Sequence, residues 1–403
     1  MLILSGVVCT ALLLDFWDRF ILSGKLLSDP KSRVEEEKYF SENYYVARKL
    51  FREKAREANA KLYSYPVNTA DFDLTVDFAV FRQSKTKALL HISGTHGVEG
   101  FAGSAIQTAL LERSKNLKLD TDNPTLIFVH ALNPYGYAQL RRFNEHNVDL
   151  NRNYLSQEEF NTAMKKDPNA NGYMNIDYLL NPTAFPSLRE NFWLNAFVLL
   201  MLNKYDVLKR SIVSGNYHYP RSIFFGGFEK EASILILENF LKVEMNLNEI
   251  RQFCVIDVHT GLGPAGYDSL QLSGPSDGKL GMQVFKDKED QERLHTGRNA
   301  GAFTGYEHAS GYITTGVAAL LPENTTGLYV TQEFGTVNSI LVLKATIEEN
   351  MIYHHFPFLR LSYAEKLRDV FYLHQSVFWK QCVITRGLEV FDQLYGSLIL
   401  NQQ

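Results

Sequence analysis

Two residues whose side chains bind metals stand three positions apart after an apolar run. His96 and Glu99 belong to the segment THGVEG, residues 95–100, which follows the apolar residues 88–92. An imidazole nitrogen and a carboxylate oxygen at this spacing can close on one ion, and both suit Zn²⁺. A second histidine would complete a His₂Glu set with one open position, which is typical of a catalytic zinc site. On its own, the pair is also compatible with a polar surface turn.

Two further polar residues stand at or near the ends of apolar runs. His259 follows residues 253–258, FCVIDV, and Glu333 lies within residues 328–336, LYVTQEFGT. Because parallel strands end at one edge of a sheet, both side chains are expected to meet the first pair there. A carboxylate beside a metal could move the proton of a water molecule. Asp257, inside the apolar run, needs a partner because a buried lone carboxylate is costly.

Residues 141–153, RRFNEHNVDLNRN, form a polar run rich in arginine and asparagine. Such a run could be a solvated loop with no role in binding. It could also anchor a substrate, because arginine binds carboxylates through two parallel hydrogen bonds. The sequence of this run is compatible with both a solvated loop and a substrate anchor.

The apolar runs also predict the elements that position these residues. Strands are expected at residues 88–92, 125–131, 253–258 and from 328, and an edge or half-buried strand at the alternating residues 72–81. A helix over 101–113 separates the first two, an order typical of a parallel sheet with a right-handed crossover. Other helices are expected at 39–60, 187–208 (with Ser187 and Glu190 as a capping box), 229–248 and 340–373, and a flexible excursion at 155–171.

Length and composition place the chain among ordinary globular proteins. It has 403 residues, of which 45% are hydrophobic and 21% charged, and a net charge of −4. The acidic balance argues against a nucleic-acid partner, which would select a basic surface. Cys9, Cys254 and Cys382 are odd in number and far apart, so neither a disulfide framework nor a zinc–thiolate cluster is expected. The length is enough for one large α/β domain or two smaller ones. We expect one domain at residues 35–403 after an apolar extension and linker at residues 1–34.

The first residues form a short apolar stretch. Residues 1–14 carry no charged side chain, and Asp15 follows them at once. The stretch is too short to span a bilayer comfortably and lacks the positive flank of a signal peptide. An apolar helix or extension is expected, with a targeting or anchoring role as the alternative. Membrane association is expected only through this segment. The expected location is therefore the cytoplasm, with an N-terminally anchored or secreted protein as the alternative.

Taken together, the motifs resemble the zinc metallocarboxypeptidase superfamily, and more closely an uncharacterised carboxypeptidase-like branch of it. The resemblance extends over residues 35–360 in islands. It implies a three-layer α/β/α sandwich with a mixed, mostly parallel central sheet and a site at the C-terminal rim of that sheet. The matching motifs are His96-x-x-Glu99, Asn133-Pro134-x-Gly136, Val148-Asp149-Leu150-Asn151-Arg152-Asn153, Asp257-x-His259 and Glu333.

The resemblance also implies roles for the residues of the centre. His96, Glu99 and His259 match the ligands of one Zn²⁺ per chain. Glu333 matches the general base and acid. Arg142 matches the arginine that polarises the scissile carbonyl, with Arg141 as the fallback.

Residues that would hold substrate or orient a ligand are implied in the same way. Asn151 and Arg152 match the pair that grips the terminal carboxylate of the substrate. Asp149 matches the carboxylate that orients the first zinc-bound histidine, as ligating histidines require. The mobile tyrosine of carboxypeptidases has no clear counterpart, and Tyr306 and Tyr312 are both candidates.

The function implied by the resemblance is zinc-dependent hydrolysis of an amide bond next to a free carboxylate. Release of a C-terminal amino acid from a peptide is the simplest form. The alternative is deacylation of an N-acyl amino acid, as in aspartoacylase and succinylglutamate desuccinylase, whose Gly-x-His-Gly-x-Glu start is similar to residues 94–99. A non-catalytic binding protein on the same fold is the third hypothesis.

Overall fold

The computed structural model of the chain describes residues 35–67, 73–184, 191–202, 205–273, 278–295 and 310–400. Several sequence predictions lie outside these ranges: the extension at residues 1–34, Cys9, the capping box of Ser187 and Glu190, and Tyr306. None of the described helices is long and apolar enough to cross a lipid bilayer.

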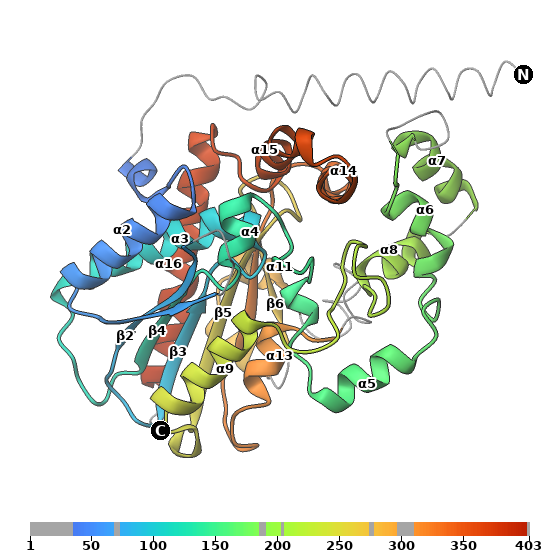
Figure 1. The fold of residues 1–403 in the computed structure, drawn as a ribbon. Helices are drawn as coiled ribbons and strands as arrows, with labels where there is room; N and C mark the ends of the chain where they lie inside the picture. The colour runs from blue at the N-terminus through green and yellow to red at the C-terminus, as the bar shows by residue number, and fades with distance from the viewer. Residues whose placement is uncertain are drawn as a thin grey trace, which may run out of the picture.

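A sheet of eight strands runs through the centre of the molecule (Figure 1). The pairs β4–β3, β3–β5, β5–β8 and β6–β7 are parallel, whereas β1–β2, β2–β4 and β6–β8 are antiparallel. The mixed, mostly parallel sheet confirms the predicted fold class. In spatial order, the strands are β1 (Lys61–Pro66), β2 (Thr75–Phe81), β4 (Thr125–His130), β3 (Lys87–Ile92), β5 (Gln252–Thr260), β8 (Tyr329–Phe334), β6 (Asp268–Leu272) and β7 (Leu294–His295).

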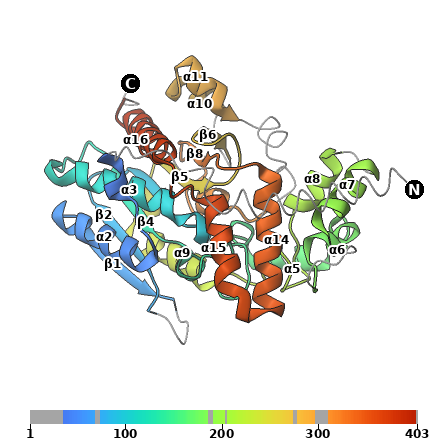
Figure 2. The same ribbon diagram turned by 90° about the horizontal axis from the view of Figure 1, so that it is seen from above.

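Helices cover both faces of the sheet and make the two outer layers of the three (Figures 1 and 2). One face carries α2 (Tyr44–Glu57), α3 (Gly100–Arg113) and α16 (Val377–Leu400), and the other carries α9 (Ala232–Glu244) and α13 (Ile313–Ala318). The central strands read as continuous apolar runs because they are buried on both sides. In β3, Leu89 belongs to the core under α3 and α16, and Leu90 to the core under α9.

The predicted crossover is present, because β3, α3 and β4 follow one another and the two strands pair in parallel. Helices α14 (Ser339–His355) and α15 (Arg360–Phe371) lie beyond the end of β5. The hydroxyl of Thr260, the last residue of β5, donates to the carbonyl of Phe371 at 2.7 Å and fixes that end of the sheet to α15.

Helices α5 (Gln157–Lys165), α6 (Asp177–Leu180), α7 (Phe192–Leu202) and α8 (Tyr205–Val213) lie to one side of the sheet (Figures 1 and 2). The flexible excursion predicted at 155–171 is wrong, because a capping box between Ser156 and Glu159 starts α5 there. The single helix predicted at 187–208 is two helices. The residues of α7 are almost all apolar, whereas α8 mixes apolar with charged residues, so one helical period does not run through both.

The prediction of an edge or half-buried strand at 72–81 is also wrong. β2 pairs on one side with β1 and on the other with β4, and nearly all of its residues are buried. The edge is β1, whose alternating exposure the sequence analysis did not recognise. Two short strands, β6 and β7, and the long helix α16 were likewise not predicted.

Candidate metal centre

The side chains of His96, Glu99 and His259 meet at one point. The Nδ1 atoms of the two histidines lie 3.1 Å apart. Glu99 places Oε1 2.9 Å from Nδ1 of His96 and Oε2 3.0 Å from Nδ1 of His259. All three residues are buried, with at most 3% of their surface exposed. Two imidazole nitrogens and a carboxylate therefore converge in a site screened from bulk water.

Local packing explains how the first two residues reach this point. After β3, Gly94 adopts a positive φ of 65°, which turns the chain toward His96. The short 3₁₀ helix Gly97–Glu99 then packs on α4 (Pro134–Gln139). A Cβ atom on Gly97 would lie 2.0 Å from the carbonyl carbon of Gly136, so this approach requires glycine. Gly94 thus allows the turn after β3, and Gly97 allows the close contact with α4.

Glu333 comes to the centre through strand register. It pairs with His259 between the parallel strands β8 and β5, so both side chains lie on the same face of the sheet. Its Oε1 accepts a hydrogen bond from the amide of Leu262 at 3.1 Å. Burial, and next the charge of Glu99, raise the pKa of Glu333 to about 8. A carboxyl group in this setting can exchange a proton near neutral pH.

Each histidine turns its second ring nitrogen to a buried carboxylate. Nε2 of His96 lies 3.1 Å from Oδ1 of Asp149. Nε2 of His259 lies 2.9 Å from Oδ2 of Asp257, whose Oδ1 accepts from the hydroxyl of Thr95 at 2.8 Å. In the tautomer in which each Nε2–H donates to its carboxylate, each Nδ1 keeps a lone pair directed at the partner ligands. The donor set and its supporting carboxylates therefore fit Zn²⁺.

The pairing of Asp257 with His259 is the feature that sequence reasoning missed. Asp257 was recognised as needing a partner, but no role was assigned to it. The signal was present in the spacing Asp257-x-His259, since residues two apart in a strand point to the same face. Thr95, one residue before the first histidine, gave no comparable signal.

The two neighbouring arginines have different surroundings. Arg142 is buried, and its Nη1 donates to Oε1 of Glu99 at 2.9 Å, with Nη2 2.9 Å from Nε2 of His96. Arg141 points elsewhere, and its Nε donates to Oε1 of Glu349 in α14 at 2.8 Å. Arg142 therefore lies at the centre, while Arg141, the fallback, fastens the loop to α14.

The Asn133-Pro134-x-Gly136 motif supports the position of Arg142. The Asn133 side chain accepts from the amide of Gly136 at 2.8 Å and donates to the carbonyl of Arg142 at 3.2 Å. The same carbonyl accepts from the amide of Gly97 at 3.2 Å. This motif thus joins the loop that carries Arg142 to the turn that carries the first ligand pair.

Asn151 and Arg152, the predicted carboxylate anchors, are almost fully buried. The Asn151 side chain accepts from the amide of Ile313, at the start of α13, at 3.0 Å. The Arg152 guanidinium donates to the carbonyls of Asn151 and Val213, both at 2.8 Å. It also lies 5.3 Å from the ring centre of Tyr312, one of the two candidate tyrosines.

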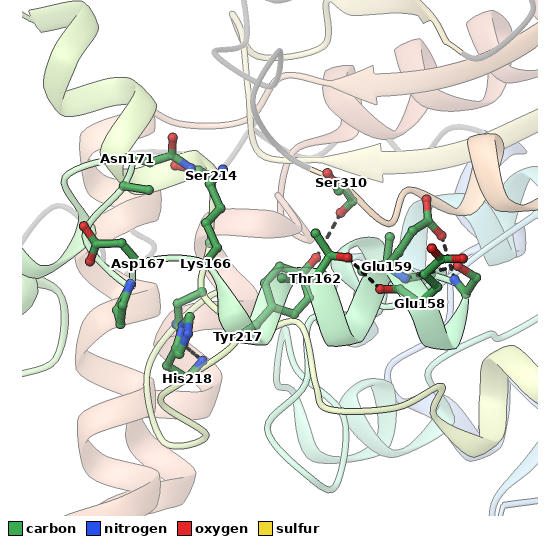
Figure 3. Close-up of a pocket in the computed structure, with 17 residues that line it drawn as sticks. Glu158, Glu159, Thr162, Lys166, Asp167, Asn171, Ser214, Tyr217, His218 and Ser310 are labelled. Carbon is green, nitrogen blue, oxygen red and sulfur yellow. Dashed lines mark hydrogen bonds between the residues drawn. The ribbon is translucent and has the colours of Figure 1, made fainter.

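A pocket of about 390 Å³ lies between α5 and residues 214–218, and its lining includes Lys166 and His218 (Figure 3). In its wall, the hydroxyl of Tyr217 donates to the carbonyl of Arg152 at 2.7 Å. Gly215, also in the wall, presents its Cβ position 3.6 Å from Nε of Arg152. The predicted anchor therefore lies directly behind this pocket.

A protein-family comparison identifies the chain at the level of its family. The family described as "Protein of unknown function (DUF2817)" matches residues 40–386, which include every residue of the centre. The chain belongs to this family. No curated protein matches the DUF2817 chain in sequence.

Three of the solved structures that are similar to this DUF2817 chain are the following. Thrombin activatable fibrinolysis inhibitor is 13% identical, with 89% of this chain and 74% of that chain covered and a TM-score of 0.47. Carboxypeptidase A from Helicoverpa armigera is 12% identical (90% and 80% covered, TM-score 0.45). A succinylglutamate desuccinylase from Silicibacter sp. TM1040 is 13% identical (73% and 67% covered, TM-score 0.31). The TM-scores of these three structures are below 0.5, so the function of this chain is inferred from its own residues.

Proposed function

We propose that the protein is a zinc-dependent hydrolase that cleaves an amide bond next to a free carboxylate. One observation carries the proposal: the buried convergence of His96, Glu99 and His259 beside Glu333 in strand register. The three ligand atoms would hold one Zn²⁺ and leave a position open, as catalytic zinc sites do. Hydrolysis of a peptide from its C-terminus is the leading reaction.

The residues around the centre can perform the steps of amide hydrolysis. When bound, zinc lowers the pKa of a water molecule and polarises a carbonyl group. The Glu333 carboxylate would accept the proton of the attacking water and deliver it to the leaving nitrogen as the C–N bond breaks. The guanidinium of Arg142, next to Glu99, would stabilise negative charge on the carbonyl oxygen.

Selection for a free carboxylate is proposed to come from Asn151 and Arg152. A buried guanidinium binds a carboxylate strongly because the two groups can form parallel charged hydrogen bonds. An N-acyl amino acid offers the same carboxylate as the C-terminus of a peptide. Deacylation of such a compound is therefore the alternative reaction at the same centre, and a non-catalytic binding protein remains the third hypothesis.

The test measures metal content and hydrolysis together on the full chain. Elemental analysis should find zinc in the wild type and one equivalent less in His96→Ala. The control His374→Ala should lose no zinc, because the imidazole of His374 pairs with Asp369 and not with a residue of the centre. Chelation should abolish activity, and added zinc should restore it. The proposed metal centre would be overturned if wild type and His96→Ala had the same zinc content and the same activity with zinc.

A substrate panel then separates the hypotheses. It contains a peptide with a free C-terminus, the same peptide as a C-terminal amide, and small N-acyl amino acids. Cleavage of the first but not the second supports the peptidase, and cleavage of the third alone supports the deacylase. A zinc-loaded protein that binds these compounds and hydrolyses none would support the binding-protein hypothesis.

A further inference from the structure

A second group of metal-binding side chains lies apart from the centre already described. It consists of Glu145, His146 and Glu231, each of which offers one ligand atom within 4.8 Å of the others. Nδ1 of His146 lies 2.7 Å from Oε2 of Glu231. An imidazole and two carboxylates form a donor set suited to first-row divalent ions such as Zn²⁺ or Mn²⁺.

A fixed turn presents two of the three side chains. The side-chain oxygen of Asn144 accepts from the amides of His146 and Val148, at 3.0 and 2.8 Å. The backbone amide of Asn144 donates to the carbonyl of Val148 at 3.0 Å and closes the turn. Glu145 and His146 are therefore held at its tip.

The third side chain is held from the opposite side. Glu231 directly precedes α9, and its amide donates to the side chain of Asn153 at 2.7 Å. Its Oε2 also accepts from the Asn144 side chain at 2.8 Å. Glu231 is thus held through its backbone by Asn153 and through its carboxylate by Asn144, and its side chain is only 10% exposed.

The group carries an excess of negative charge. Among the described residues, Glu231 forms an ion pair with His146 alone, and Glu145 forms none. Glu229 adds a further negative charge close to His146. Burial raises the pKa of Glu145. Within the part of the chain that the structure describes, no arginine or lysine pairs with either carboxylate, so a bound cation would relieve the repulsion between them.

We propose that Glu145, His146 and Glu231 bind a second divalent metal ion, distinct from the proposed zinc of the hydrolytic centre. The ion would connect the tip of the loop at 144–148 to the start of α9. The same loop continues directly into Asp149, which faces His96. The second ion would therefore stabilise the loop that supports the centre, without taking part in the reaction.

The experiment is equilibrium dialysis of the full chain against Zn²⁺ alone, after chelation, with the metal counted per chain. Wild type should bind two equivalents, and His146→Ala, Glu231→Gln and His96→Ala should each bind one. The double variant His96→Ala/His146→Ala should bind none. His374→Ala is the matched control, because His374 faces a single carboxylate, that of Asp369, at 3.4 Å, and it should keep two equivalents.

Thermal unfolding gives a second readout that is independent of the hydrolytic centre. Zn²⁺ should raise the Tm of His96→Ala and leave that of the double variant unchanged, because only a bound ion stabilises the folded state. The His146 side chain is 67% exposed, so its replacement should leave the fold intact, as circular dichroism can verify. The proposal is overturned if His146→Ala and Glu231→Gln each bind as much zinc as wild type. If only the proposed zinc site of the hydrolytic centre were wrong, wild type would bind one equivalent of zinc. His146→Ala would then lose that equivalent, and His96→Ala would keep it.

Discussion

Nε2 of His259 lies 2.9 Å from Oδ2 of Asp257, and the opposite ring nitrogen faces Glu99 at 3.0 Å. One imidazole therefore connects a buried carboxylate to the proposed metal site. The carboxylate fixes the orientation of the ring and raises the basicity of the nitrogen that would bind zinc. The Thr95 hydroxyl, at 2.8 Å from Asp257, in turn fixes the carboxylate.

Asp257→Asn should weaken zinc binding by about 10–100-fold, because the neutral amide supports the imidazole less strongly than a carboxylate does. Competition with a chromogenic chelator measures the affinity. Thr95→Ser keeps the hydroxyl and should retain wild-type affinity, whereas Thr95→Val should lose part of it. Unchanged affinity in Asp257→Asn would show that Asp257 has no role in zinc binding.

Glu333→Gln should keep zinc and lose turnover by about 10²–10⁴-fold, because the amide cannot accept the proton of water. The measurements are zinc content and kcat on the substrate identified by the panel. Glu333 is 5% exposed and the replacement has nearly the same volume, so the fold should persist. Near-normal turnover would exclude Glu333 as the base.

Arg152→Lys should raise KM for substrates with a free carboxylate by about 10–100-fold, the effect of about 1.5–3 kcal/mol of lost charged hydrogen bonding. Lysine keeps the charge and loses the paired donors. Arg113→Lys, at an exposed pair with Asp392, is the control. An unchanged KM for substrates with a free carboxylate in Arg152→Lys would contradict the anchoring role.

Gly97→Ala should destabilise the protein by about 1–3 kcal/mol, because the new methyl group would overlap the backbone of Gly136. The matched control is Gly396→Ala in α16, where a Cβ meets nothing within 4 Å. In that helix, alanine should stabilise by about 0.4–1 kcal/mol. Urea unfolding measures the change in unfolding free energy, which should be negative for Gly97→Ala and positive for Gly396→Ala. The same change in both variants would contradict the close contact of the 3₁₀ helix with α4.

Glu112 should make stability depend on pH below about 4.5. Hydrogen bonds from Tyr39 (2.7 Å) and Lys38 (3.0 Å), joined by Lys54, lower the pKa of Glu112 to about 2. Because the folded pKa lies below the unfolded one, the stabilisation is complete above the unfolded pKa and is lost as pH falls toward 2.

Glu112→Gln should therefore lose about 1–2 kcal/mol of unfolding free energy at pH 7, after allowance for solvent screening, and little at pH 2. Urea titrations at both pH values give the difference. Glu53→Gln on the exposed side of α2 is the control and should show a smaller difference. The same loss at both pH values would show that charge pairing is not the cause.

The sequence by itself determined the central strands, the crossover helix and the candidate chemistry. The strands β3, β4, β5 and β8 and the helix α3 were predicted because apolar runs buried on both faces are visible along the chain. The spacing of His96 and Glu99, and the positions of His259 and Glu333 near strand ends, named the residues that the structure brings together. Local pattern suffices for these features because each depends on neighbours in the sequence.

Only the tertiary structure decided which residues face one another across long separations. The register between β5 and β8 places Glu333 beside His259. Arg141 binds Glu349 of α14 and so points away from the centre, whereas Arg142 binds Glu99 within it. The true edge of the sheet was likewise decided by pairing, since β1 covers β2. The physical reason is that strand order and side-chain partners depend on packing between segments far apart in the chain. The local hydrophobic pattern does not indicate which distant segments pack together.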